Sequence, residues 1–185
     1  MGVTVTPQEF HYVYFDASAI ADVATDLLEQ LGMAERELRI EVDETTPIAR
    51  ITIDVGDPLV VRAESGALED TRKPRQLSAD VAATSLGRVL LKARDRLDGT
   101  FGEAPPDEEL TLAQVAAWET YCVGRLGRAG YPVHEQRWRY NFRNRHGFND
   151  TADAAFDDVW TAERMTWSEL AELSDETIAA GSVVA

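Results

Sequence analysis

The chain has 185 residues, of which 33 are acidic and 18 basic, and its net charge is −15 at pH 7. A strongly negative surface repels nucleic acid and anionic membranes, so neither is an expected general partner. The single cysteine, Cys122, allows no intramolecular disulfide, which is typical of a reducing compartment. The start of the chain lacks the pattern of a signal peptide, and no apolar run is long enough for a membrane span. We therefore expect a cytoplasmic protein.

Apolar spacing in the N-terminal half predicts one helix followed by strands. From Ile20 to Leu31 the apolar residues fall on one face of a helix. Apolar and polar residues then alternate over 38–43 and 48–55, and an apolar run at 59–61 continues the pattern. The close succession of these strands favours an antiparallel meander.

Other segments of this half are aromatic or polar. Residues 10–15 are aromatic and β-branched, which predicts a strand or a packed N-terminal arm, and residues 66–77 predict a polar connection. Ser78 caps a long amphipathic helix that Gly99 ends. Two amphipathic helices must cover one face of the sheet. We therefore expect these residues to be buried: Leu27, Leu31, Leu86, Val89 and Leu90.

The C-terminal half predicts helices. The proline pair in the loop 102–109 marks a division into an α/β part, residues 1–101, and a helical part, residues 102–185, within one continuous domain. Helices are expected at about 110–126, 152–164 and 167–173, and the last dozen residues are expected to form a loose tail. The predicted class is α+β: a small antiparallel meander sheet of three to four strands, packed against several amphipathic helices, with a helical C-terminal half.

Sequence motifs for catalysis or metal binding are absent. The chain has no glycine-rich phosphate loop, no dinucleotide-binding fingerprint and no nucleophile elbow. Its histidines, His11, His134 and His146, are isolated, and one cysteine cannot begin a cysteine-rich zinc site. We therefore predict no catalytic residue, no cofactor and no metal.

The order of elements in residues 18–98 resembles the minimal zincin-like metallopeptidases: a helix, a small set of strands, and a long helix entered from a polar loop. In that family the long helix carries H-E-x-x-H, whose histidines bind zinc. Here the matching stretch contains no ligand and reads Thr84-Ser85-Leu86-Gly87-Arg88. The resemblance therefore implies a degenerate, metal-free relative.

Charge is concentrated in one segment. Residues 124–147 hold six arginines and one acid, a net charge of +5, whereas the rest of the chain holds 12 bases and 32 acids, a net charge of −20. Trp138, Tyr140 and Phe142 alternate with polar residues, which predicts a strand. The spacing of Trp138 and Phe142 also fits a short helix, and both interpretations stay open.

Three interpretations explain this arginine-rich segment. The arginines can neutralise acids of their own domain, dock on an acidic surface of a partner protein, or bind single-stranded nucleic acid by pairing with phosphates while the aromatic rings stack on bases. The strong negative charge elsewhere makes nucleic acid the least favoured. The candidate binding residues are Arg137, Trp138, Arg139, Tyr140, Arg143, Arg145 and His146.

The preferred function is that of a non-catalytic interaction protein that uses this segment. The alternatives are a hydrolase-like or degenerate zincin-like protein without metal ligands, and a nucleic-acid-binding accessory protein. A pocket in which acids face Arg137, Arg139 or Arg143 would favour an enzyme. A convex arginine surface would favour binding.

Overall fold

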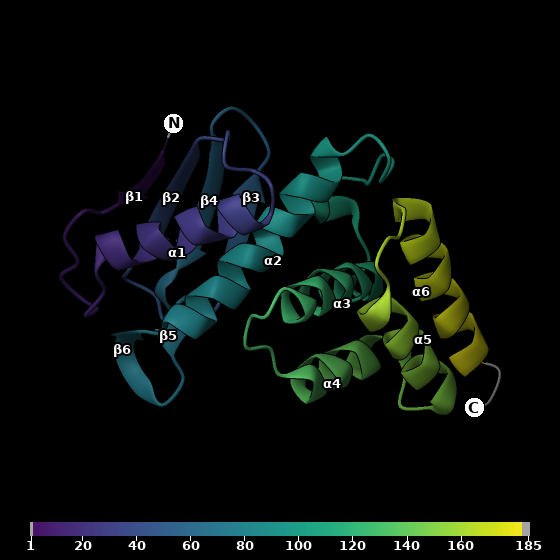
Figure 1. Ribbon diagram of the computed structural model, residues 1–185. Helices are drawn as coiled ribbons and strands as arrows, with labels where there is room; N and C mark the ends of the chain where they lie inside the picture. Colours follow the sequence, from purple (N-terminus) through teal and green to yellow (C-terminus); the bar gives the residue numbers. More distant parts are fainter. Residues whose placement is uncertain (1, 183–185) are drawn as a thin grey trace. The chain divides into compact units, whose positions relative to one another are not determined.

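The structure, a computed structural model, describes residues 2–182. It is of the α+β class, as the sequence predicts (Figure 1). The helices are α1 (Ala17–Gln30), α2 (Ala79–Leu97), α3 (Leu112–Arg128), α4 (Glu135–His146), α5 (Asp150–Thr161) and α6 (Trp167–Ser182). The strands are β1 (Val3–Thr6), β2 (Leu38–Asp43), β3 (Ile51–Asp54), β4 (Leu59–Glu64), β5 (Glu69–Asp70) and β6 (Lys73–Leu77). The chain divides into two compact units, residues 1–94 and 95–185. The domain boundary expected after residue 101 stays a prediction.

The main sheet of the first unit is mixed, with the strand order β1-β2-β4-β3. β2 pairs in parallel with both β1 and β4, and only the edge strand β3 is antiparallel. The predicted antiparallel meander is therefore wrong. The chain passes from β2 to the edge strand β3, and β4 then returns between the two. Alternation of apolar residues specifies which face of a strand is buried but not which strand lies beside it.

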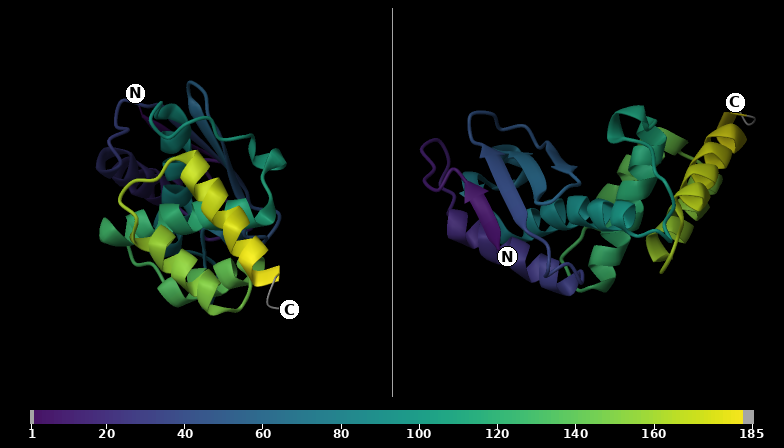
Figure 2. Two further views of the ribbon diagram at one scale, coloured as in Figure 1. Left: turned by 90° about the vertical axis from the view of Figure 1, so that its right-hand side faces the viewer. Right: turned by 90° about the horizontal axis from the view of Figure 1, so that it is seen from above.

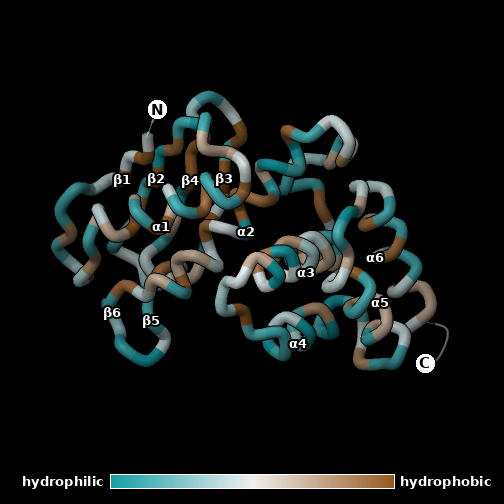
Figure 3. Tube along the Cα trace, in the orientation of Figure 1, coloured by the Kyte–Doolittle hydropathy of each residue, from teal (hydrophilic) through white to brown (hydrophobic). Residues whose placement is uncertain are grey.

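Helices α1 and α2 lie on the same face of this sheet (Figures 1 and 2). Burial alternates along β2 and β4, so each strand turns one row of side chains into the core. Hydrophobic positions occur along both strands in the trace coloured by hydropathy (Figure 3). The opposite face of the sheet carries their polar residues. The predicted core residues of α1 and α2 are confirmed as buried: Leu27, Leu31, Leu86, Val89 and Leu90.

A two-stranded antiparallel sheet, β5 and β6, stands where the sequence predicts only a polar connection. The aromatic segment at residues 10–15 is not a regular strand. Its Tyr14 forms an isolated parallel bridge with Gln76 and donates its N–H to the carbonyl oxygen of Arg75 at 2.7 Å. The N-terminal strand is β1, which comes before this segment.

Helix α3 is central to the second unit and contacts α4, α5 and α6. Cys122 on this helix is fully buried, and it packs as a small side chain in the core of the unit. Gly124 permits a close approach of α5, because a Cβ atom at this position would lie 2.3 Å from the carbonyl oxygen of Trp160. Only glycine fits this crossing without a shift of one helix.

A buried carboxylate fixes α3 against the last turn of α2. Both oxygens of Asp95 accept hydrogen bonds from the guanidinium of Arg125, at 2.7 and 2.6 Å, and one also accepts from Nε1 of Trp118 at 2.8 Å. The guanidinium lies over the ring of Tyr121, 3.9 Å from its centroid. Because Asp95 is only 4% exposed, this ion pair is largely screened from water.

The predicted loose tail is wrong for residues 174–182, which continue α6 to Ser182, and residues 183–185 lie outside the described part. The buried side of this helix includes Ser174 and Thr177. The Thr177 hydroxyl donates to the carbonyl oxygen of Leu173 at 2.6 Å. Polar residues whose hydrogen bonds are satisfied thus occupy buried positions of α6 that a hydrophobic repeat would fill with apolar residues.

We predict that Leu90→Ala lowers the free energy of unfolding by about 2–5 kcal/mol, because it leaves a cavity at a fully buried site. Urea denaturation followed by circular dichroism measures the change. Leu112→Ala is the control, since Leu112 is 64% exposed and its loss should cost less than about 0.5 kcal/mol. Equal costs for the two variants would contradict the packing described for α2.

We predict that Asp95→Asn costs about 3–5 kcal/mol, because it leaves the charge of Arg125 buried without its counter-ion. Asp54→Asn breaks the exposed pair with Arg62 and should cost less than about 1 kcal/mol. The same denaturation experiment compares them. A stability of Asp95→Asn close to that of Asp54→Asn would show that the buried pair is dispensable.

Candidate functional site

The arginine-rich segment forms helix α4, which decides between the two interpretations of its periodicity. Phe142 and His146 occupy its buried side. His134 precedes the helix, and Gly147 ends it with a φ of 110°, a backbone conformation that favours glycine. The candidate residues therefore lie around a helix rather than on one face of a strand.

Two of the candidate arginines bind acids of the neighbouring helix α5 and of α4 itself. Arg139 donates to Glu135 at 2.8 Å and to Asp157 at 2.5 Å, and Arg143 donates two bonds to Asp153, at 2.6 and 2.5 Å. Hydrogen bonding from Arg143 lowers the pKa of Asp153. Such contacts are expected if these two arginines neutralise acids of their own domain.

The arginines of α3 also act within the second unit. Arg125 binds the buried Asp95. Arg128 donates to the carbonyl oxygen of Ala162 at 2.5 Å and to that of Trp160, and so satisfies acceptors at the C-terminal end of α5. A cation at this end also interacts favourably with the helix dipole.

His146 is buried and contributes to the core. Its Nδ1 lies 3.1 Å from the carbonyl oxygen of Phe142, which can only accept, so Nδ1 carries the proton. Its Nε2 then accepts from the Ser174 hydroxyl at 2.9 Å. Burial lowers the pKa of His146, and the bond to Phe142 and the charge of Asp175 oppose this shift only in part. The imidazole is therefore neutral at pH 7.

The remaining candidates form a solvent-facing surface, which we call the α4 face: Arg137, Tyr140, Arg145 and the following residue Phe148. The rings of Tyr140 and Phe148 meet edge to face, with centroids 5.8 Å apart, and are 60% and 63% exposed. Among residues 2–182, neither Arg137 nor Arg145 takes part in an ion pair. Trp138 is half-buried and is not part of this surface.

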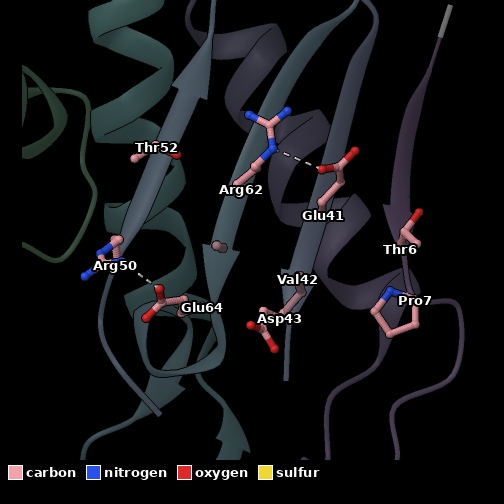
Figure 4. Close-up of a pocket in the computed structure, with 10 residues that line it drawn as sticks. Thr6, Pro7, Glu41, Val42, Asp43, Arg50, Thr52, Arg62 and Glu64 are labelled. Atoms are coloured by element: carbon pink, nitrogen blue, oxygen red, sulfur yellow. Dashed lines mark ion pairs between the residues drawn. The ribbon is translucent and has the colours of Figure 1, made fainter. Parts of the chain in front are cut away.

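A second candidate site, which the sequence did not predict, is a pocket of about 580 Å³ on the polar face of the main sheet. It lies where β1, β2 and β4 end, at Thr6, Asp43 and Glu64 (Figure 4). Ligands of α/β proteins commonly bind at the carboxyl ends of parallel strands. These residues are far apart in sequence, and only the register of the strands brings them together, so no local pattern could reveal them.

Both arginines of this pocket are paired with acids that also line it. Arg62 contacts Glu41 at 3.3 Å, and Arg50 contacts Glu64 at 3.2 Å (Figure 4). Hydrogen bonds from the side chain and backbone of Thr45 lower the pKa of Asp43, which therefore stays ionised at neutral pH and cannot serve as a general acid. The pocket can offer hydrogen bonds to a small polar molecule.

Comparisons with protein-family models, with curated protein sequences and with solved structures gave no match to this chain. Within residues 2–182, no three or more histidine, cysteine or acidic side chains are grouped so that they could hold a metal ion. In the same part of the chain, no helix has both the length and the apolar character that crossing a membrane requires.

We predict a stability difference between the wild type and His146→Gln that depends on pH. Since burial lowers the folded-state pKa of His146, the unfolded chain binds the proton first. The stabilising effect of the neutral imidazole is complete above about pH 6.5 and is lost as the pH falls below it, by at most about 1.4 kcal/mol per pH unit.

Urea denaturation of both proteins at a series of pH values between 5 and 8 measures this effect, and the variant, which has no imidazole, corrects for the titration of carboxylates. A constant difference in stability across this range would contradict the burial of a neutral His146.

Proposed function

We propose that this chain is a non-catalytic binding protein that holds an acidic surface of a partner protein against the α4 face. The observation that carries the proposal is the combination of two exposed, mutually packed rings with two arginines that have no ion pair among the described residues. Tyrosine, phenylalanine and arginine are enriched at protein interfaces, where they supply most of the binding energy.

The arrangement of α4 supports this proposal. Arg137 and Tyr140 are three residues apart and are neighbours on the helix surface, and Phe148 extends the apolar part from Tyr140. Arg137, Asn141 and Arg145 are spaced four residues apart, so they form a row along the helix beside Tyr140. The result is a small apolar centre with cations beside it, the layout of a protein docking surface.

Charge complementarity favours an acidic partner. In a chain with 33 acids and 18 bases, acids are available to pair with every arginine, yet Arg137 and Arg145 remain exposed. Repulsion from the net charge of −15 does not prevent docking, because interactions between exposed charges are screened beyond about 8 Å at physiological salt. Two arginines are few for nucleic acid, whose affinity rises with the number of phosphates contacted.

A hydrolase-like function has less support. Arg139 and Arg143 face acids, but these acids are their ion-pair partners on α4 and α5. In the stretch that corresponds to the zincin motif, Leu86 and Gly87 are buried, and no side chain there is a metal ligand. The sheet pocket favours binding of a small polar ligand as a second candidate function, because it lies at the ends of three parallel strands.

We predict that Arg137→Gln/Arg145→Gln weakens binding of a labelled amphipathic peptide of glutamate and leucine by roughly two- to thirtyfold, as expected for the loss of two ion pairs at an interface rim. Tyr140→Ser/Phe148→Ser should weaken it as well. Fluorescence anisotropy at low and at physiological ionic strength measures the affinity. All four side chains are exposed, so the free energy of unfolding should change by less than about 1 kcal/mol.

Arg139→Gln/Arg143→Gln is the matched control, because it removes the same number of charges from the same helix. This variant should lower the free energy of unfolding by about 1–2 kcal/mol, since it removes a bidentate pair with Asp153 and the pair with Asp157, and it should keep its affinity for the peptide while folded. The proposal fails if the wild type does not bind the peptide, or if both double variants bind it equally well.

A further inference from the structure

The first unit exposes two tyrosine rings that the proposed function does not use. Tyr12 and Tyr14 are the most exposed of the large apolar side chains in the described part, at 65% and 77%. Both rings face solvent, whereas Val13 between them is buried and anchors the segment to the core. Exposed aromatic rings gathered on one surface are typical of interaction sites.

The segment that carries these rings is held in place by specific hydrogen bonds. One carboxylate oxygen of Glu44 accepts the backbone N–H groups of His11, at 2.8 Å, and Tyr12, at 2.6 Å. The N–H of Tyr14 donates to the carbonyl oxygen of Arg75 in β6. The exposure of the rings is therefore built into the fold, and a preorganised surface loses less conformational entropy when it binds.

The adjacent hairpin presents three exposed cations: Arg72, Lys73 and Arg75. No ion pair involves them among residues 2–182. The acids of the same hairpin are engaged with backbone instead, since Asp70 accepts the N–H of Arg72 at 2.8 Å and Glu69 accepts the N–H of Arg75. The cationic side chains are thus left available to a ligand outside the fold.

Arg75 also has an unusual backbone conformation. Its φ is 63°, and within the described part it is the only residue other than glycine with a positive φ. A side chain in this region strains the backbone, and glycine would relieve the strain. Arg75 therefore destabilises the fold locally, and strain of this kind tends to occur at functional sites.

We propose that Tyr12, Tyr14, Arg72, Lys73 and Arg75 form a docking surface, the tyrosine–hairpin surface, for an extended acidic segment of a partner protein. The cations pair with carboxylates, the phenol groups donate hydrogen bonds to them, and the rings cover the backbone between. An extended segment fits because two of the cations, Lys73 and Arg75, follow one another along the strand β6 and Tyr14 lies beside that strand. The inference is independent of the α4 face.

A short acidic segment fits this surface better than a nucleic acid. A single strand carries a phosphate at every nucleotide, and three cations would hold it only weakly at physiological salt. Beyond those cations the strand would meet the acids that border the surface, Glu9, Asp16 and Glu44. An acidic segment of a protein places its charge over the cations alone.

The probe is a labelled peptide of alternating glutamate and proline, which stays extended in water. Fluorescence anisotropy should show binding by the wild type at low ionic strength. Arg72→Gln/Lys73→Gln and Tyr12→Ser/Tyr14→Ser should each weaken it by roughly two- to thirtyfold, with unchanged melting temperatures because the side chains are exposed. Arg75→Gly should weaken binding and yet raise the melting temperature, since it removes the cation and the strain together.

Arg137→Gln/Arg145→Gln is the control and should bind this probe as the wild type does, so the two proposed surfaces are tested separately. No binding by the wild type at low ionic strength, or equal affinities of the wild type and both hairpin and tyrosine variants, overturns the inference. Tighter binding of oligothymidylate than of the peptide, lost in the same variants, overturns it in favour of a nucleic-acid surface.

Discussion

In the helical unit the carboxylate of Asp95 is buried, and its burial is tolerated only because three hydrogen-bond donors converge on it. Two come from Arg125 and one from Trp118, two turns apart on α3, so the carboxylate fixes both the position and the rotation of that helix. The ring of Trp118 in turn packs on Phe101 and on Trp167, the first residue of α6. An ion pair and a ring stack thus orient the elements around α3.

The arginines of this unit show that residue type alone does not define a role. Arg125 compensates a buried charge, Arg128 satisfies carbonyl oxygens at the end of α5, and Arg139 and Arg143 join α4 to α5. A concentration of positive charge in an acidic chain is therefore mainly a consequence of packing an arginine-bearing helix against an acidic one. Only two arginines of the segment, Arg137 and Arg145, make no such contact among the described residues, and they belong to the same surface as the exposed rings of Tyr140 and Phe148.

The helices α1 and α2 and their buried residues follow from the sequence because a repeat near 3.6 residues specifies both the element and its inner face. The sheet topology does not, since β4 has the same alternation whether it pairs with β2 or with β3 alone. The segment at Trp138 and Phe142 fits either period, and its contacts with α5 decide for a helix. The end of α6 escaped prediction because Ser174 and Thr177, rather than apolar residues, face the core. The α4 face and the sheet pocket depend on which neighbours are present, which is a property of tertiary structure.

The close crossing of α3 and α5 at Gly124 has a consequence for how the helical unit can be divided. Gly124 and Gly127 each weaken the C-terminal half of α3 by about 1 kcal/mol relative to alanine, so this half has little tendency to be helical by itself. The backbone of α5, which needs the missing side chain at Gly124 to approach, supplies the contacts that stabilise it. A fragment that ends before α5 would lose not only that helix but also the second half of α3, and the unit is therefore the smallest part of this region that can be expected to fold as a module.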